Sequence, residues 1–298
     1  MILKNSGAIT PDLHVLGLID LPAFVLNAAQ PAVIDAGMTF MGKRYIEEMQ
    51  GVLNGCGPAY FFLTHTHYDH CGAVPILKAA YPDMAVCCSE AGEEVLKRPR
   101  AIQTIRELNR SAAEYFENLG EAVLDSSDFE PFAVNRTLAD GEKISLRADL
   151  SLMAISTPGH TRDSMCFYVP ERKILFTGEA LGIMTDDGYI FSEWLSDYND
   201  YLNSMKKLQA LDVDILCLGH GHVLTGRDAV EYIPKSIEYC KYFRQLIEDT
   251  LRETGGDVEE TKRRIKAREY DPLPGAKQPD FAYLLNLEAK IRAIQKIS

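Results

Sequence analysis

Long hydrophobic runs are missing from this sequence: no stretch of eighteen apolar residues occurs. The opening segment, residues 1–12, reaches Asn, Ser, Gly and Pro before the apolar core of a signal peptide could form. The sequence therefore predicts a cytoplasmic protein that does not insert into a membrane. Positive charge is also scarce, since 31 Lys and Arg stand against 43 Asp and Glu, for a formal net charge of −12. Because this balance repels a polyanion, a nucleic-acid partner is disfavoured.

Paired cysteine spacings are absent as well. The seven cysteines are an odd number and fall mostly inside apolar runs, so we expect reduced, buried thiols rather than a disulfide framework. A content of 46% hydrophobic and 25% charged residues is typical of a well-packed chain. The length of 298 residues allows one core with an appendage, but not two full-size enzymes.

Two strand-rich blocks are present, each accompanied by helical patterns. Short apolar runs bounded by turn residues predict strands, and apolar residues at helical spacing predict helices. Two such blocks favour an α/β fold in which two sheets stack face to face with helices outside, giving four layers. The first block has strands within 13–37, 59–65 and 84–89 and helices at 39–53, 71–80 and 100–119; the second has strands within 132–179 and 214–220 and a helix at 198–211.

Strand signals vanish after residue 227, and three helical stretches remain, at 228–254, 258–268 and 280–297. We expect residues 1–228 to form the main domain and residues 229–298 a helical extension on or over the active-site cleft. Apolar stripes run along the first and last of these helices, and they either pack on the body or form a lid or a homodimer surface. The stripe on the last helix comprises Phe281, Leu284, Leu285, Ile291 and Ile294.

A dense group of possible metal ligands follows the apolar run AYFFLT. His65, His67, Asp69 and His70 lie within six residues, directly before a predicted helix. A chain leaving a buried strand must curl to bring these side chains to one side, and a metal ion supplies a common target. This spacing is a strong indication of a metal site.

Three further candidates follow later strands. His160, Glu179 and His220 each come after an apolar run and stand beside glycine. Glycine allows a close approach of the backbone or a positive φ, which a turn presenting a ligand at a sheet edge requires. Asp35, after the run PAVI, is interpreted either as a hydrogen-bond acceptor for ligand imidazoles or as an ordinary turn carboxylate.

The motifs THTHYDHCG, TPGHT, FTGEA and LGHGH, in this order, resemble those of the metallo-β-lactamase-fold hydrolases over roughly residues 8–228. The resemblance implies an αββα sandwich with a dinuclear metal centre between its sheets. Together with the turn at 140–142 and the helical tail, the motifs are most similar to those of quinolone-signal response proteins and glyoxalase II-like thioesterases.

The resemblance also implies a role for each ligand. His65, His67 and His160 would bind the first metal ion, and Asp69, His70 and His220 the second. Glu179 would bridge the two ions. The family usually has Asp at this place, so the extra methylene requires a shifted loop, a longer metal separation or loss of the bridge, and the second ion is expected to be held less securely.

Imidazole and carboxylate ligands suit zinc, iron or manganese, and zinc is the default expectation. Two cations about 3.5 to 4 Å apart lower the pKa of a shared water from 15.7 toward about 7, which makes hydroxide available for attack on an acyl or phosphoryl centre. Asp69 is the predicted catalytic residue, because a carboxylate beside this water could orient it or carry its proton. The resemblance favours a small-molecule acyl ester or thioester as substrate. A lactonase remains open, as does a signalling or regulatory protein with a vestigial metal site.

Overall fold

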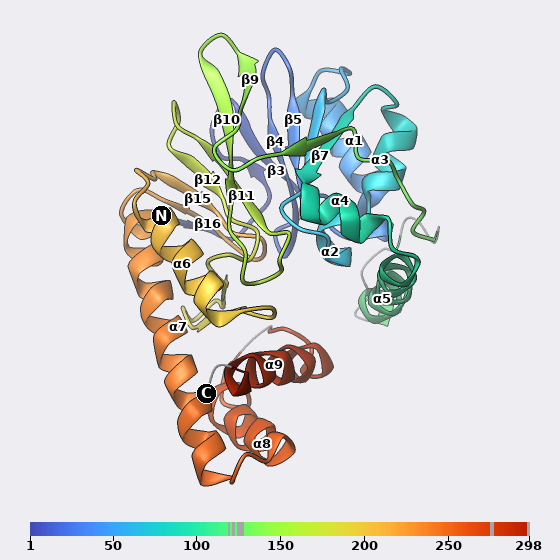
Figure 1. Ribbon diagram of the computed structural model, residues 1–298. Coiled ribbons are helices and arrows are strands. Elements are labelled where there is room, and N and C mark those ends of the chain that lie inside the picture. Colours follow the sequence, from blue (N-terminus) through green and yellow to red (C-terminus); the bar gives the residue numbers. More distant parts are fainter. Residues whose placement is uncertain (119, 121–122, 124–127, 275–276, 297–298) are drawn as a thin grey trace.

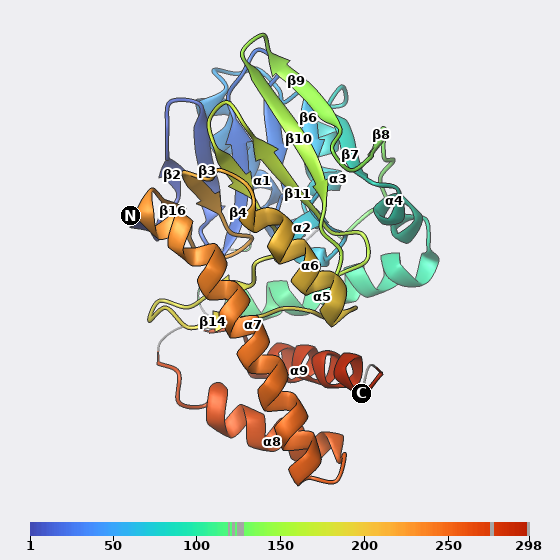
Figure 2. The same ribbon diagram turned by 60° about the vertical axis from the view of Figure 1, so that its left-hand side comes forward.

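The computed structural model describes residues 1–298 apart from 119, 121–122, 124–127, 275–276 and 297–298. Two seven-stranded sheets form its centre, and helices lie on their outer faces (Figures 1 and 2). The first sheet has the order β2-β3-β4-β5-β6-β7-β8. Its strands are β2 (Gly7–Ala8), β3 (Leu13–Leu18), β4 (Leu21–Leu26), β5 (Ala32–Ile34), β6 (Tyr60–Phe62), β7 (Ala85–Ser89) and β8 (Arg136–Leu138).

The second sheet has the order β1-β16-β15-β12-β11-β10-β9. A separate pair of short strands, β13 (Ile183–Met184) and β14 (Ile190–Phe191), precedes the helix α6 (Tyr198–Gln209). The strands of the second sheet are β1 (Ile2–Leu3), β9 (Lys143–Arg147), β10 (Leu150–Ser156), β11 (Met165–Val169), β12 (Ile174–Phe176), β15 (Ile215–Cys217) and β16 (Val223–Thr225).

The facing sides of the two sheets bury an apolar layer between them. Two aromatic pairs cross it, Phe24 with Phe176 at 5.4 Å and Phe62 with Phe167 at 5.3 Å between ring centroids. Central strands such as β5, β6 and β12 are short apolar runs because both of their faces are covered. The predicted four-layer αββα sandwich is therefore confirmed.

Helices of the first block cover the outer face of the first sheet, and α6 with the tail helices covers that of the second. The first helical segment is a short 3-10 helix, Thr39–Met41. The helices are α1 (Gly42–Val52), α2 (Tyr68–Cys71), α3 (Val74–Ala80), α4 (Glu90–Leu96), α5 (Pro99–Asn118), α6 (Tyr198–Gln209), α7 (Arg227–Glu253), α8 (Val258–Glu269) and α9 (Asp280–Gln295).

The helix expected at 71–80 is wrong in its extent. The structure has two helices, α2 and α3, separated at Gly72, whose N–H donates to the carbonyl of Gly37 at 2.9 Å. A Cβ at this position would lie 2.5 Å from the carbonyl oxygen of Tyr68, so only glycine permits the packing. The helix expected at 100–119 is α5; its predicted last residue, Leu119, lies outside the described part of the chain.

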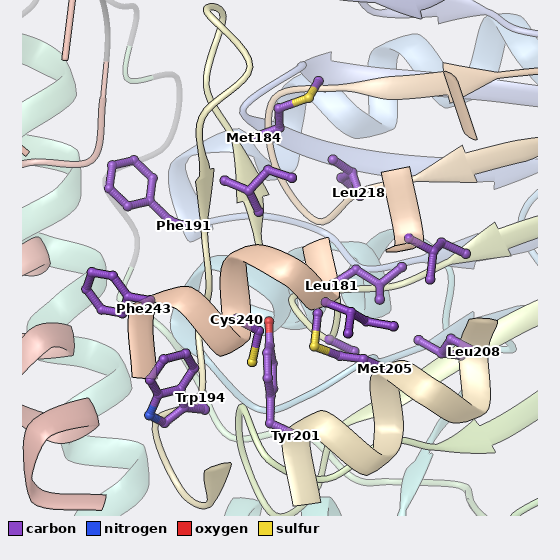
Figure 3. Close-up of a cluster of buried hydrophobic side chains, with 14 of the residues drawn as sticks. Leu181, Met184, Phe191, Trp194, Tyr201, Met205, Leu208, Leu218, Cys240 and Phe243 are labelled. Atoms are coloured by element: carbon purple, nitrogen blue, oxygen red, sulfur yellow. The ribbon is translucent and has the colours of Figure 1, made fainter. Parts of the chain in front are cut away.

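The tail helices share one apolar core with the second sheet and α6 (Figure 3). The predicted boundary at residue 228 falls in the first turn of α7, and the division into two units stays a prediction. Of the stripe predicted on α9, Phe281 and Leu285 do not pack on the body, because they are 60% and 64% exposed, while Lys290 outside the stripe is buried. Whether the exposed pair belongs to a lid or a homodimer surface stays a prediction. The buried face consists of Tyr283, Leu287, Lys290, Ile291, Ala293 and Ile294.

Two further expectations can be compared with the structure. Six of the seven free cysteines are buried, but Cys56 is exposed, contrary to the expectation for that residue. Among the described helices, none combines the length and apolar character needed to cross a bilayer. The cytoplasmic location and a homodimer through the C-terminal helices stay predictions.

Candidate metal centre

Loops that follow strands of both sheets meet at one edge of the sandwich. In the first sheet, β5 and β6 are parallel, so Asp35 and the His65–His70 segment emerge side by side. In the second sheet, β12 and β15 are parallel, so Glu179 and His220 emerge together. Carboxyl ends of parallel strands share an edge, which is where open α/β sheets place their sites. In Figure 1 this edge carries α2 and faces α9.

Glycines at the loop bends permit this convergence. Gly159 has φ +131°, and a Cβ there would collide with the backbone of Tyr201. Gly178 has φ +48°, and a Cβ there would come within 2.8 Å of Thr64. The sequence-based expectation that these glycines allow close approach is confirmed.

The first group of possible ligands joins three imidazoles and a carboxylate. His160 Nε2 lies 3.2 Å from His65 Nε2 and 3.1 Å from His67 Nδ1. Glu179 Oε1 lies 3.5 Å from the same His160 nitrogen and 3.8 Å from His65 Nε2. All four ligand atoms of this group are within 4.8 Å of one another.

The second group shares Glu179 with the first. Its other members are Asp69, His70 and His220, again with all ligand atoms within 4.8 Å of one another. Glu179 Oε1 lies 3.5 Å from both His70 Nε2 and His220 Nε2. One carboxylate oxygen therefore faces both groups, and the longer side chain of Glu179 reaches the position between them. The structure thus brings together all seven residues that the sequence singled out.

In four of the five rings, the nitrogen that faces away from the cluster lies close to an oxygen atom. His160 Nδ1 lies 2.7 Å from the carbonyl oxygen of Glu193, and His220 Nδ1 lies 2.6 Å from that of Asp20. His65 Nδ1 lies 3.0 Å from Thr64 Oγ1. An acceptor at Nδ1 keeps the proton there and leaves Nε2 with a free lone pair directed into the cluster.

Asp35 connects the two groups. Its Oδ2 lies 2.9 Å from His70 Nδ1 and accepts a hydrogen bond from Thr64 Oγ1 at 2.7 Å, while Oδ1 accepts from Thr64 N–H at 2.8 Å. Thr64 in turn faces His65, so one buried carboxylate orients one imidazole directly and another through a hydroxyl. This geometry favours the interpretation of Asp35 as a support for the cluster over that of a turn carboxylate.

The two groups differ in how readily they lose protons. Burial, followed by the neighbouring imidazoles, holds the pKa of His65 well below its usual value, and burial with His160 lowers the pKa of His67 to about 4. Burial is the largest influence on His70 and acts against its charged form, but Asp35, Glu179 and Asp69 together outweigh it and raise the pKa of that ring. In the same way, burial is opposed at His220 by Glu179 and Asp69, which together raise its pKa.

The residues present fit divalent metal ions. A tetrahedral site with bonds of about 2.0–2.1 Å places its ligand atoms about 3.3 Å apart, close to the four separations of 3.1 to 3.8 Å given above for the first group. Two buried atoms of the second group, Asp69 Oδ1 and His70 Nε2, have no hydrogen-bond partner among the described residues. Such atoms are costly unless something satisfies them, and a cation would do so.

Sequence reasoning missed residues that act behind the ligands. Asp163 Oδ2 accepts a hydrogen bond from Thr66 N–H at 2.8 Å and so fixes the loop between His65 and His67. Glu193 supplies the carbonyl that holds His160. No local pattern marks these residues, because each contact joins segments distant in sequence. His222 is buried but belongs to neither ligand group.

Comparison with known proteins agrees with this architecture. The family model described as the metallo-beta-lactamase superfamily matches residues 23–220. The chain is 30% identical over 199 residues to the acyl-coenzyme A thioesterase MBLAC2 of Bos taurus, covering 62% of this chain and 65% of that protein. It is 31% identical over 160 residues to the hydroxyacylglutathione hydrolase of Bartonella tribocorum, covering 53% of this chain and 47% of that protein.

These matches span less than two-thirds of either relative. Among solved structures, a metallo-beta-lactamase family protein of Thermus thermophilus superposes with a TM-score of 0.67 at 19% identity, covering 97% of this chain and 95% of that one. This likeness extends the agreement in fold to nearly the whole chain, including the tail helices. The match to the family model covers most of both sheets and all the loops that carry the cluster. The chain therefore belongs to the metallo-β-lactamase superfamily.

Proposed function

We propose that the protein is a metal-dependent hydrolase that cleaves a small acyl thioester. The observation that carries the proposal is the pair of ligand groups joined by Glu179 Oε1. His65, His67 and His160 would hold one ion and Asp69, His70 and His220 the other. When bound, zinc or a similar divalent cation would supply a Lewis acid and lower the pKa of a water molecule toward about 7.

The chain's own residues would direct the reaction. Asp69 is the member best placed to act on a proton, because its side chain is 18% exposed and so is more open to solvent than Glu179, the other carboxylate of the cluster, at 6%. His220 is 13% exposed, whereas His65, His70 and His160 are 1% exposed. His67 is likewise half-buried, so the substrate would approach past Asp69, His220 and His67, while the three buried imidazoles are closed to solvent.

The relatives support the substrate class. One is a thioesterase of acyl-coenzyme A by name, and another is a hydrolase of hydroxyacylglutathione. Both names describe an acyl group joined to a thiol carrier. An acyl thioester is accordingly proposed ahead of a lactone.

The test is a panel of acyl-coenzyme A, S-acylglutathione, lactone and phosphodiester substrates assayed with the zinc-loaded protein. Thioester hydrolysis should be fastest, and His67→Ala and Asp69→Asn should each reduce it by about a hundredfold or more. His14→Ala is the matched control, since His14 lies on β3 outside both ligand groups.

Faster turnover of a lactone or a phosphodiester would reject the thioester as substrate class. Parental activity in both site variants would reject the cluster as the reaction centre. Absence of turnover of any substrate by the metal-loaded protein would instead favour the regulatory alternative.

A further inference from the structure

A buried ion pair joins the C-terminal helix to the loop behind the metal centre. Lys290 Nζ on α9 lies 2.9 Å from Glu193 Oε1, and the two side chains are 1% and 0% exposed. Asn286, one turn earlier on α9, donates from Nδ2 to Glu193 Oε2 at 3.2 Å. Both carboxylate oxygens of Glu193 are thus bound by one helix, 93 and 97 residues away in sequence.

The backbone of Glu193 contacts the metal centre. Its carbonyl oxygen holds His160 Nδ1 at 2.7 Å. Its N–H donates to Tyr201 Oη at 3.3 Å, and that hydroxyl donates to the carbonyl of Glu179 at 3.0 Å. Glu193 therefore contacts a ligand of the first group directly and, through Tyr201, the backbone of Glu179, the residue shared by both groups.

Other residues of this loop donate hydrogen bonds to the turn that carries His160. The N–H groups of Ser196 and Asp197 donate to the carbonyl of Gly159 at 3.1 and 3.2 Å, and Ser196 Oγ donates to the same oxygen at 3.0 Å. A displacement of the loop would consequently move the backbone beside His160.

Aromatic packing fixes the loop between β14 and α6. Trp194 lies next to Phe243 of α7, with ring centroids 5.8 Å apart (Figure 3). It also lies next to Tyr198 of α6, at 5.2 Å between ring centroids. Lys290 Nζ lies 5.6 Å from the centroid of Phe243, so the ion pair is part of the same packed cluster. Charges in such surroundings are costly to desolvate, and replacing buried pairs by apolar residues is often neutral or stabilising. Stability alone therefore gives little reason for Lys290 at this position.

We propose that Lys290 is a positioning residue for the metal centre: through Glu193 it fixes the carbonyl that holds His160 Nδ1, and so keeps His160 Nε2 directed at His65 and His67. The inference rests on the proposed function in that the cluster holds metal. It makes α9, far outside the motifs that carry the ligands, part of the machinery that sets metal affinity.

The test compares Lys290→Met with Lys290→Arg, using zinc affinity measured by competition with a chromophoric chelator. Lys290→Met should leave the Glu193 carboxylate without its cation and weaken binding of the tighter zinc ion by about tenfold to a hundredfold, the range found when groups behind metal ligands are removed. Lys290→Arg keeps the charge and should restore most of the affinity.

Lys262→Met is the matched control. Lys262 on α8 pairs with Glu288 on α9 at 2.9 Å and is 13% exposed, so its loss weakens a tail contact with no link to His160. It should change the thermal unfolding of the metal-free protein without changing zinc affinity. The visible spectrum of the cobalt-loaded protein reports ligand geometry and should change in Lys290→Met alone.

A second variant keeps the test valid if Lys290→Met folds poorly. The double variant Lys290→Met with Glu193→Gln replaces the unpaired buried carboxylate by a neutral amide and should recover part of the lost zinc affinity. Zinc affinity of Lys290→Met within about twofold of the parent would overturn the inference, as would an equal loss in Lys262→Met. Failure of the parent to bind zinc would instead overturn the proposed function, so the two failures are distinguishable.

Discussion

The substitution Asp35→Asn tests whether the Asp35 carboxylate determines which nitrogen of His70 carries the proton. The substitution preserves the shape of a buried side chain but removes its charge and one of its acceptors. In the native chain, Oδ2 faces His70 Nδ1 and the Thr64 hydroxyl, and Oδ1 faces Thr64 N–H. Either orientation of the new amide turns its NH2 group toward a donor, His70 Nδ1–H in one case and Thr64 N–H in the other.

The consequence for His70 follows from its two nitrogens. To accept a hydrogen bond from the amide that Asp35→Asn introduces, the ring must move its proton from Nδ1 to Nε2, the atom that faces Glu179 at 3.5 Å. A protonated Nε2 has no lone pair for a metal ion. Loss of such an acceptor typically costs about tenfold to a hundredfold in metal affinity, or about 1.4 to 2.7 kcal/mol. The loss of affinity should appear for the more weakly bound ion, which His70 would help to hold.

The assay is zinc binding by chelator competition, with circular dichroism to establish that the metal-free variant is folded. Asp12→Asn is the control, because Asp12 pairs with Arg147 at 3.3 Å and precedes β3, at the edge of the sheet opposite the cluster. Unchanged affinity in a folded Asp35→Asn protein would refute the account of how the imidazoles are oriented.

Two other predictions concern the shared carboxylate and protons. Glu179→Gln keeps the side chain's length but removes the charge common to both groups, so metal content should fall to one ion or fewer per chain; retention of two ions would contradict the bridging role. Acidification from about pH 8 to about pH 5 should release the second ion before the first. The pKa values of His70 and His220 are raised, so protons compete for those rings above the usual range, whereas the lowered pKa values of His65 and His67 keep them unprotonated in mild acid. Simultaneous release of both ions during a pH titration monitored by chelator absorbance would contradict this order.

The sequence predicted the cluster well because its signals are local. His65, His67, Asp69 and His70 follow a strand whose apolar run is unmistakable, and His160 and His220 each follow another beside glycine. Strand ends in layered α/β folds converge at an edge, so recognising the strands was enough to expect the ligand loops to meet. The family resemblance implied that Glu179 lies between both groups, and the structure places it there. How its extra methylene is accommodated could not be predicted, since that depends on how far the loop brings the backbone toward the cluster.

The tail was harder to predict because its burial is decided by tertiary contacts. Helical periodicity placed Phe281 and Leu285 on one apolar stripe of α9, but both are exposed, and the helix turns Lys290 and Asn286 toward Glu193. Similarly, α5 exposes Tyr115 and buries Asn109, whose Oδ1 accepts hydrogen bonds from Thr39. A polar residue with a distant partner has no signature in its own segment. Sequence periodicity therefore located these helices and part of their inward faces, such as Ile291 and Ile294 of α9, but not the buried polar residues.

Elemental analysis of the protein purified without added metal or chelator tests the central claim most directly. The convergence of seven ligands predicts between one and two transition-metal ions per chain. The content should fall in His65→Ala, which removes a ligand of the first group, and stay at the parental level in His14→Ala. Metal content near zero in the gently purified parent, or equal content in the two histidine variants, would contradict the account.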